Sequence, residues 1–437
     1  MINYFFIIVL FANLVTGQFG PYEQDFGYVT VREGCHMFYW LFYTTASVNT
    51  YNERPLIVWL QGGPGGSSTG IGNFEILGPI DLLTLQERNH TWIKNFNVIF
   101  LDNPVGTGFS YVDDMSFLTK TNDEIAQDFV KFMGGFYEKH PEFERVPLYV
   151  FGQSYGGKMV VDMAIRMVEA KRNQAIRSNL RGIGMGNSWI TPVSMTLSWA
   201  PLLLAASLVD EEGYHAIQES AREAERLYNE ELYLNSTLQW GQTQGVVFER
   251  TNNVDWYNIM NKMNPSYRTR RTENEITRDM VLDIKQYKFS SRNYVDIDEF
   301  MNTQVKEALN IPDHVRWESV NMNVFNTLRE DFMKPVTDGI EKLLNETDLI
   351  ITKYNGNVDL ICCTPGQIEW VDQLRWPGAE GYRNSPRRAI WEAGKLEGYY
   401  KSFGNFRFFW INSAGHSAPA DNPAATAALL RDMTTFG

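Results

Sequence analysis

A serine between two glycines, in the stretch Gly152-Gln153-Ser154-Tyr155-Gly156, is the residue whose setting best suits covalent chemistry. Residues 147–151 before it form an apolar, strand-like run, and residues 159–166 after it have the broad apolar face of a helix. A serine on such a turn must adopt a strained backbone, and the flanking glycines remove Cβ atoms that would clash there. The stretch could also be an ordinary glycine-rich turn, but the strand and helix around it favour a nucleophile elbow. We therefore predict that Ser154 is a nucleophile.

The serine needs a base, because a neutral hydroxyl attacks poorly until a positioned imidazole takes its proton. The histidines that follow Ser154 in the chain are His215, His314 and His416. Of these, His416 directly follows an apolar strand-like run at residues 406–411, so we expect it at the carboxyl end of a strand. The other two lie in a charged helical segment and in a loop, and are more simply surface residues.

The imidazole in turn needs a carboxylate to orient it, and in an α/β-hydrolase the order along the chain is Ser, acid, His. Asp359 follows the apolar run at residues 349–354 through a turn rich in Asn and Gly. Asp348 lies at the opposite end of that run. An aspartate in a turn is often only a turn former, so Asp359 is predicted from order and position.

An oxyanion formed by attack at a carbonyl needs two N–H donors close to the nucleophile. A glycine-rich loop, Gln61-Gly62-Gly63-Pro64-Gly65-Gly66, follows the apolar residues 56–60 and allows the backbone to approach a substrate closely. We expect the donors to be the backbone N–H groups of Gly63 and Tyr155. A phosphate-binding loop is excluded because the Gly-Lys-Ser/Thr ending is missing.

Strand-like and helical patterns alternate along much of the chain, which is typical of an α/β sheet. Thr121 with Glu124 predicts a capping box at the start of one helix. From about 188 to 294 the pattern turns helical, charged and Asn-rich, and we interpret this segment as a cap over the active-site edge of the sheet. The expected strands are 27–32, 37–43, 56–60, 98–101, 180–186, 349–354 and 406–411, and the expected late helices are 365–374 and 423–433.

The predicted organisation is a signal peptide at 1–17, a first core segment at 18–187, the cap at 188–294 and a second core segment at 295–437. Residues 4–15 are almost wholly apolar, too short to span a bilayer comfortably, and are followed by small residues suited to signal cleavage. No later run reaches membrane-spanning length. Three acceptor sequons, which begin at Asn89, Asn235 and Asn345, agree with a secretory route and predict glycosylation.

Composition limits the function further. The chain has 437 residues, of which 44% are hydrophobic, so it can bury a large core. Its net charge of −13 argues against nucleic-acid binding, which needs a basic surface. The cysteines are Cys35, Cys362 and Cys363, and an odd number in a secretory chain leaves at least one thiol unpaired or an intermolecular bridge.

With these motifs in hand, the chain resembles the serine carboxypeptidases, peptidases of α/β-hydrolase fold that remove C-terminal residues in lysosomes, vacuoles or outside the cell. The resemblance is carried by Trp59-Leu60-Gln61-Gly62-Gly63-Pro64-Gly65, by residues 73–79 and 101–111, by the elbow, by Tyr354-Asn355-Gly356-Asn357-Val358-Asp359 and by Gly415-His416. The motif Ser-Tyr-Gly-Gly-Lys at residues 154–158 and residues 331–335 look most like the retinoid-inducible serine carboxypeptidase branch. The family triad matches Ser154, Asp359 and His416.

The resemblance also implies a site for the terminal carboxylate of the substrate, at Gln61, Gly62, Gln153 and Glu75. The family usually has Asn at position 61 and Glu at position 153, where the glutamate shares a proton with the residue matching Glu75. An amide at 153 donates without needing that proton. Cys362 matches a position where many relatives carry an unpaired cysteine near the substrate pocket, and Ser417-Ala418-Pro419 replaces a frequent Met-Val-Pro.

We therefore expect a secreted or lysosomal serine-type carboxypeptidase, in which Ser154 attacks the last peptide bond, His416 moves the proton and Asp359 fixes the histidine tautomer. No cofactor and no metal are implied. Peptide or protein C-termini are the expected partners, without nucleic acid or a membrane span, and a homodimer is left open. The alternatives are a non-catalytic protective or binding protein on the hydrolase fold, and a serine carboxypeptidase-like acyltransferase.

Overall fold

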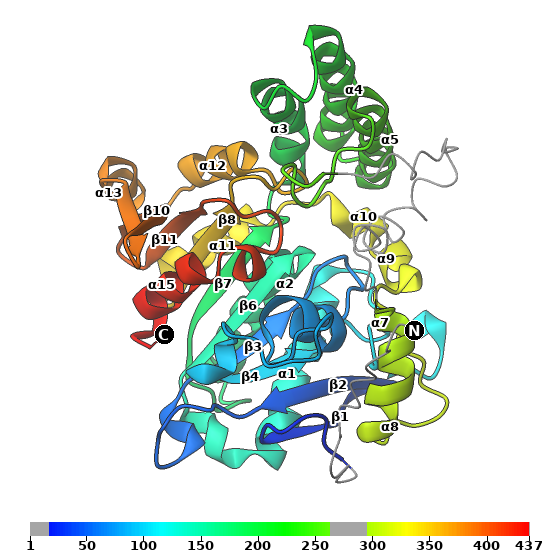
Figure 1. The fold of residues 1–437 in the computed structure, drawn as a ribbon, viewed down its shortest axis with the longest axis vertical. Helices are drawn as coiled ribbons and strands as arrows, with labels where there is room; N and C mark the ends of the chain where they lie inside the picture. The colour runs from blue at the N-terminus through cyan, green and yellow to red at the C-terminus, as the bar shows by residue number, and fades with distance from the viewer. Residues whose placement is uncertain (1–16, 263–294, 437) are drawn as a thin grey trace, which may run out of the picture.

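The computed structural model describes residues 17–262 and 295–436, which fold around one 11-stranded sheet (Figure 1). The strand order is β1-β2-β4-β3-β6-β7-β8-β11-β10-β9, with β5 paired to β2. The six strands from β4 to β11 in this order are parallel, and the strands outside them pair antiparallel. The strands are β1 (Gln24–Arg32), β2 (Cys35–Phe42), β3 (Leu56–Leu60), β4 (Asn97–Leu101), β5 (Tyr111–Val112), β6 (Leu148–Ser154), β7 (Leu180–Ser188), β8 (Ile350–Gly356), β9 (Arg388–Glu392), β10 (Lys395–Phe403) and β11 (Phe406–Ile411).

Helices connect the parallel strands and cover both faces of the sheet, as parallel strands require. The α-helices are α1 (Asn122–Lys139), α2 (Tyr155–Arg172), α3 (Pro192–Ala205), α4 (Glu211–Asn229), α5 (Tyr233–Thr251), α7 (Ile297–Phe300), α8 (Lys306–Ala308), α9 (Met322–Thr327), α10 (Arg329–Phe332), α11 (Thr337–Glu346), α12 (Thr364–Gln373), α13 (Ala379–Asn384), α14 (Ala418–Asp421) and α15 (Pro423–Thr434). In the described ranges, the π-helices are η2 (Ser68–Leu77) and η7 (Met301–Val305), and the short 3-10 turns are η1 (Tyr51–Glu53), η3 (Trp92–Lys94), η4 (Met115–Phe117) and η5 (Pro141–Arg145).

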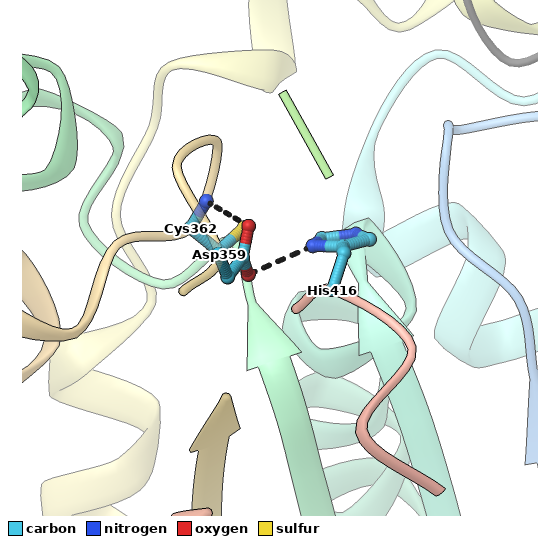
Figure 2. A group of neighbouring side chains, drawn as sticks. All are labelled: Asp359, Cys362 and His416. Carbon is cyan, nitrogen blue, oxygen red and sulfur yellow. Dashed lines mark hydrogen bonds and ion pairs between the residues drawn. The ribbon is translucent and has the colours of Figure 1, made fainter. Parts of the chain in front are cut away.

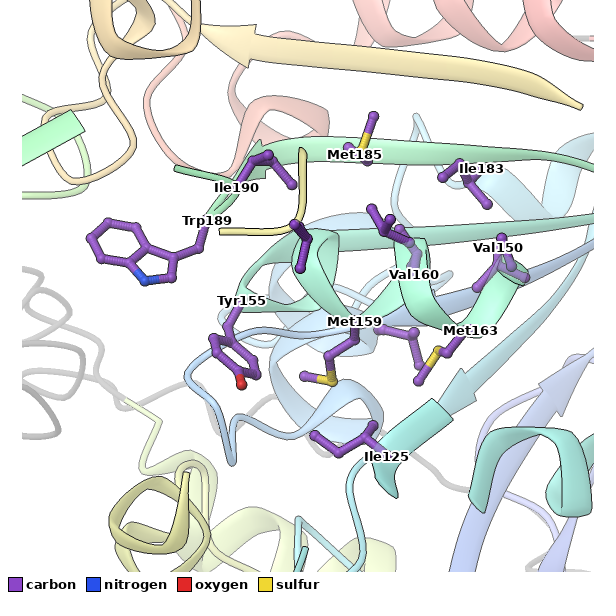
Figure 3. Packing of buried hydrophobic residues seen from close by; sticks show 14 of the residues in the cluster. Ile125, Val150, Tyr155, Met159, Val160, Met163, Ile183, Met185, Trp189 and Ile190 are labelled. Atoms are coloured by element: carbon purple, nitrogen blue, oxygen red, sulfur yellow. The ribbon is translucent and has the colours of Figure 1, made fainter. Parts of the chain in front are cut away.

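The central strands are buried on both faces, and β3 shows how the core is divided. Leu56, Val58 and Leu60 point into a cluster with α1 and α2, whereas Ile57 and Trp59 point into a second cluster with η2 and α15. Figure 3 shows part of the first cluster, in which side chains of α2 pack against β6, β7 and α1. The elbow helix is therefore held by apolar packing along its length.

The capping box predicted before α1 forms in a modified way. The Thr121 hydroxyl accepts a hydrogen bond from the N–H of Glu124 at 3.2 Å, as expected. The Glu124 carboxylate accepts from the N–H of Lys120, one residue earlier than the box would place it.

Helices α3, α4 and α5 form a group at the top of the view in Figure 1, beyond the sheet, in the chain segment between β7 and β8. The predicted end of this insertion at residue 294, and the predicted signal peptide except Gly17, lie outside the described residues. The short helices from Ile297 to Glu346 also lie between β7 and β8, and sequence analysis did not anticipate them.

Other differences concern the strands near the C-terminus and the glycine-rich loop. The β9–β10 hairpin was not predicted, because its residues include exposed charged and aromatic side chains without an apolar run. The glycine-rich loop continues into the π-helix η2, which a glycine-rich composition does not indicate. Within the described part of the chain, no helix has the length and apolarity needed to cross a membrane.

Candidate active site

Ser154 is the last residue of β6 and precedes the first residue of α2, as predicted for a nucleophile elbow. Its backbone has φ 60° and ψ −128°, a conformation that a non-glycine residue adopts only under strain. Gly152 and Gly156 make this turn possible, because a Cβ on Gly152 would collide with the carbonyl oxygen of Gly156. The strained turn holds the Ser154 side chain at the carboxyl end of the parallel strands.

The predicted acid and base lie together at this same edge. Asp359 follows β8 and His416 follows β11, and these two strands are parallel neighbours. His416 Nδ1 lies 2.9 Å from Asp359 Oδ2 (Figure 2). Asp359 is fully buried and His416 is 5% exposed, so water competes little for this contact.

Asn187, which sequence analysis missed, supports the pair. Its side-chain N–H donates to Asp359 Oδ2 at 2.7 Å and to the carbonyl oxygen of Gly415 at 3.1 Å. The N–H of Cys362 donates to the other carboxylate oxygen, Asp359 Oδ1, at 3.2 Å. These bonds fix the orientation of the carboxylate. The position of Asn187 near the end of β7 is the signal that could have identified it.

The Ser154 hydroxyl interacts with the Cys362 thiol, whose sulfur lies within 4.8 Å of the ligand atoms of Asp359 and His416. Among the described residues the Ser154–His416 hydrogen bond itself is not formed; such contacts are often long before substrate binds. Burial raises the pKa of the Cys362 thiol well above its usual value, which disfavours the reactive thiolate.

Asp359, Cys362 and His416 also form a donor set close enough to hold a metal ion. Asp359 Oδ2, however, is already shared between His416 and Asn187. The Asp359–His416 contact has the geometry of a carboxylate that orients an imidazole for proton transfer.

The histidines set aside from the sequence lie elsewhere. His215 is 75% exposed on α4, next to Glu211, and the His314 ring contacts Tyr111. The three cysteines are buried with free thiols.

The glycine-rich loop lies against the elbow. A Cβ on Gly62 would come within 2.5 Å of Ser154 Cβ and 2.9 Å of the backbone nitrogen of Tyr155, so only glycine fits there. Gly63, the next residue, has φ +112°, which also favours glycine. The two predicted oxyanion donors, Gly63 and Tyr155, therefore belong to segments in direct contact beside the nucleophile.

The residues proposed for carboxylate binding are distributed around this contact. Leu60 pairs with Gly152, which places Gln61 and Gln153 at matching ends of neighbouring parallel strands. Gln61 is 8% exposed and Gln153 is 2% exposed. Gln153 Nε2 is 3.5 Å from the Ser417 hydroxyl, whereas Gln153 Oε1 is buried without a hydrogen-bond partner among the described residues. Glu75 is half-buried on η2.

A buried ion pair ties α2 to α10 next to the elbow. Lys158 Nζ lies 2.7 Å from Asp331 Oδ2 and also donates to the Asp331 carbonyl oxygen, and the Tyr155 hydroxyl donates to Asp331 Oδ2 at 2.8 Å. The Lys158 ammonium and the hydrogen bonds hold the pKa of Asp331 below its usual value, against the opposing effect of burial. Residues 331–335, noted from the sequence only as a family signature, thus anchor the residue after the nucleophile.

Lys353, which sequence analysis also missed, is a fully buried cation on β8 just before the acid loop. Its ammonium donates to the Tyr354 carbonyl at 3.0 Å and to Asn355 Oδ1 at 2.9 Å, and the Asn355 amide donates to the Cys362 carbonyl at 2.9 Å. Burial lowers the pKa of Lys353 from 10.5 to about 7, while nearby Cys362 and Asp359 partly oppose the shift.

Replacing this lysine by methionine, Lys353→Met, is expected to stabilise the fold more at acid pH than at alkaline pH. Between the folded pKa of about 7 and the usual value of 10.5, the unfolded chain binds more protons, so parent stability rises with pH through this window. The slope acts over the two pH units between about pH 7 and about pH 9. The increase in the free energy of unfolding caused by Lys353→Met should therefore be about 3 kcal/mol larger at about pH 5 than at about pH 9. The free energy of unfolding of the parent and of Lys353→Met, measured by denaturant unfolding at both pH values, tests this prediction.

The control is Lys171→Met, at an exposed position of α2, whose effect on stability should be small at both pH values. A gain from Lys353→Met that is the same at the two pH values would mean that Lys353 does not change protonation in this range.

Comparisons with known proteins now identify the family. The profile described as serine carboxypeptidase matches residues 16–435. The chain is 38% identical to the retinoid-inducible serine carboxypeptidase of Rattus norvegicus and 37% identical to that of Homo sapiens, in each case over 94% of this chain and 91% of the relative.

The chain belongs to the serine carboxypeptidase family. The resemblance to the retinoid-inducible branch, expected from the motif Ser-Tyr-Gly-Gly-Lys and from residues 331–335, is thereby confirmed. Family membership makes the protein a hydrolase of the serine carboxypeptidase type.

A solved structure confirms the fold prediction. The crystal structure of Kex1Δp, a prohormone-processing carboxypeptidase from Saccharomyces cerevisiae, matches with a TM-score of 0.80 at 21% identity and covers 95% of this chain and 91% of that chain. The α/β-hydrolase fold of this serine carboxypeptidase is therefore as predicted.

Proposed function

We propose that this serine carboxypeptidase releases C-terminal residues from peptides through an acyl-enzyme on Ser154. The observation that carries the proposal is the buried His416–Asp359 pair, which lies with a strained Ser154 at one edge of the sheet. His416 takes the Ser154 proton as the hydroxyl attacks the last peptide carbonyl, then gives it to the departing amino acid. Water then attacks the acyl-enzyme and gives its proton to His416, which returns it to the Ser154 oxygen as the shortened peptide leaves.

The N–H groups of Gly63 and Tyr155 stabilise the negative oxygen of each tetrahedral intermediate. The approach of Gly62 to Ser154 and to the Tyr155 nitrogen supports this role, because it places both donor segments next to the reacting carbon. The buried Asp331 carboxylate binds the Tyr155 side chain and so limits movement of the second donor.

Recognition of the substrate's terminal carboxylate is assigned to Gln153, together with Gln61, Gly62 and Glu75. The Gln153 side chain is buried, and its contact with Ser417 at 3.5 Å is long for a hydrogen bond. Its amide can therefore turn its N–H toward a carboxylate at little cost.

Substrate binding by the parent should consequently persist toward neutral pH better than binding by Gln153→Glu. A glutamate at this position must hold a proton to face a carboxylate and Glu75, so KM of the variant rises as that proton leaves with increasing pH. The amide donates at every pH. KM measured against pH for both proteins tests the assignment.

The matched control is Gln373→Glu, which places the same charge on an exposed position of α12 and should leave the KM profile of the parent unchanged. If KM of Gln153→Glu follows the parent curve, Gln153 does not contact the terminal carboxylate.

The activity itself is tested with pairs of peptides that differ only in a free or an amidated C-terminus. Mass spectrometry should detect loss of single C-terminal residues from the free acids and little cleavage of the amides, because the amides lack the recognised carboxylate. Binding without cleavage would instead favour the protective role, and transfer of the acyl group to an added alcohol in place of water would favour the acyltransferase.

The signal peptide and a secreted or lysosomal location are part of the proposal. Asn89, Asn235 and Asn345 are exposed, which supports their use as glycosylation sites. Peptide-N-glycosidase treatment of protein from a eukaryotic host should lower its apparent mass, and an unchanged mass would contradict the secretory route.

A further inference from the structure

The loop that follows α5 joins the insertion to the segment that carries Asp359. The Trp256 carbonyl accepts hydrogen bonds from the N–H groups of Leu360 at 3.1 Å and Ile361 at 3.2 Å. In the opposite direction, the N–H of Ile259 donates to the Val358 carbonyl at 3.0 Å. Backbone bonds from one loop therefore hold the residues on both sides of Asp359.

The same loop holds the segment that carries His416. The N–H of His416 donates to the Tyr257 carbonyl at 2.6 Å, and the two rings are 5.2 Å apart. A Cβ on Gly415 would collide with the Tyr257 carbonyl and come within 2.7 Å of Asn258 Cβ. The acid segment and the base segment thus meet the loop at adjacent residues, Trp256 and Tyr257.

The conformation of the loop depends on Asp255, which is 3% exposed. Its Oδ1 accepts hydrogen bonds from the N–H groups of Tyr257 at 2.8 Å and Asn258 at 3.1 Å. Its Oδ2 accepts from the Asn261 amide at 2.9 Å. An aspartate that binds the backbone two and three residues on folds that backbone into a tight turn. This turn sets the direction of the Trp256 and Tyr257 carbonyls.

We propose that residues 255–261 form a catalytic clamp, in which Asp255 is a positioning residue that keeps the Asp359 and His416 segments in register. The proposal rests on the assignment of Asp359 and His416 to the triad. Asp255 does not touch the substrate; it acts through Trp256 and Tyr257. Because proton transfer depends on alignment within a fraction of an ångström, loosening the clamp lowers the rate of the chemical step while the carboxylate site around Gln153 stays intact.

The test is Asp255→Ala in the full-length protein, with kcat and KM measured separately and rates expressed per folded molecule. We expect kcat to fall by roughly 10- to 100-fold with KM within about twofold of the parent. The rate of labelling by a fluorophosphonate, which depends on Ser154 and His416 but not on a terminal carboxylate, should fall by a similar factor. Asp255→Asn keeps an acceptor for the Tyr257 and Asn258 N–H groups and should restore most of kcat.

Asp210→Ala is the matched control, because the Asp210 carboxylate also accepts from a backbone N–H in the insertion, but from Gly213 in its own helix. It should leave kcat unchanged. If Asp255→Ala does not fold, Asn261→Ala removes the hydrogen bond from the Asn261 amide to Asp255 Oδ2 and should still lower kcat by roughly fivefold.

A parent that fails to label with the fluorophosphonate would overturn the proposed function. If the parent labels and the folded Asp255→Ala variant, or Asn261→Ala in its place, matches Asp210→Ala in kcat and labelling rate, the clamp alone is wrong. A fall in kcat that Asp255→Asn does not restore would also overturn the role given to the Asp255 acceptors.

Discussion

Replacement of the elbow serine, Ser154→Ala, is expected to abolish release of C-terminal residues and labelling by a fluorophosphonate. The acyl-enzyme cannot form without the hydroxyl, and burial raises the pKa of the Cys362 thiol, which disfavours the thiolate that would have to replace it. The variant should fold, because only one oxygen of a half-buried side chain is removed. We expect kcat to fall by about 10⁶-fold, as it does when the nucleophile of other triad enzymes is removed.

A suitable control is Ser385→Ala, since the Ser385 hydroxyl donates to the nearby Tyr382 carbonyl. This variant should label and cleave as the parent does. Labelling of Ser154→Ala at the parent rate would show that another residue is the nucleophile.

The second large effect is expected for Asp359→Asn, which should lower kcat on the order of 10⁴-fold while the protein stays folded. An amide that turns its N–H toward His416 stabilises the tautomer with the proton on Nε2, which cannot accept the Ser154 proton. Asn187 and Cys362 each donate an N–H to one oxygen of the Asp359 carboxylate, so the amide of Asp359→Asn places its NH2 against one of these donors in either orientation. Steady-state kinetics on one peptide measures the loss.

The control for Asp359→Asn is Asp372→Asn on the exposed side of α12, where the same loss of charge should leave kcat unchanged. A near-normal kcat for Asp359→Asn would mean that another carboxylate orients His416. The next candidate is Asp102, although it precedes Ser154 and so departs from the order Ser, acid, His; it is fully buried and bound to Ser67, Thr69 and Phe109.

The residues placed best from the sequence are those whose neighbours along the chain predict the local backbone geometry. The elbow has a strand before Ser154, glycines around it and a helix after it, and the structure has the same order. Asp359 and His416 were found from their positions after strands, which parallel pairing of β8 and β11 brings to one edge.

The residues that were missed act through contacts that cross the fold. The roles of Asn187, Lys158, Asp331 and Asp255 depend on partners up to 176 residues away or on a turn in an inserted loop, and the sequence shows only ordinary polar residues or a family signature at these positions. Lys353 interrupts an apolar strand, which is a local signal, but its burial depends on the sheet around it. Such residues cannot be identified from periodicity, since periodicity reports only which face of an element is apolar.

The central claim, that Ser154 carries the acyl group, is tested most directly by trapping the intermediate. The parent is mixed with a slowly deacylating peptide ester, quenched in acid and digested, and the modified peptide is sequenced by mass spectrometry. The account predicts that the acyl mass is on Ser154 and is absent from Ser154→Ala. An acyl group found on Cys362, or on any residue other than Ser154, would contradict it.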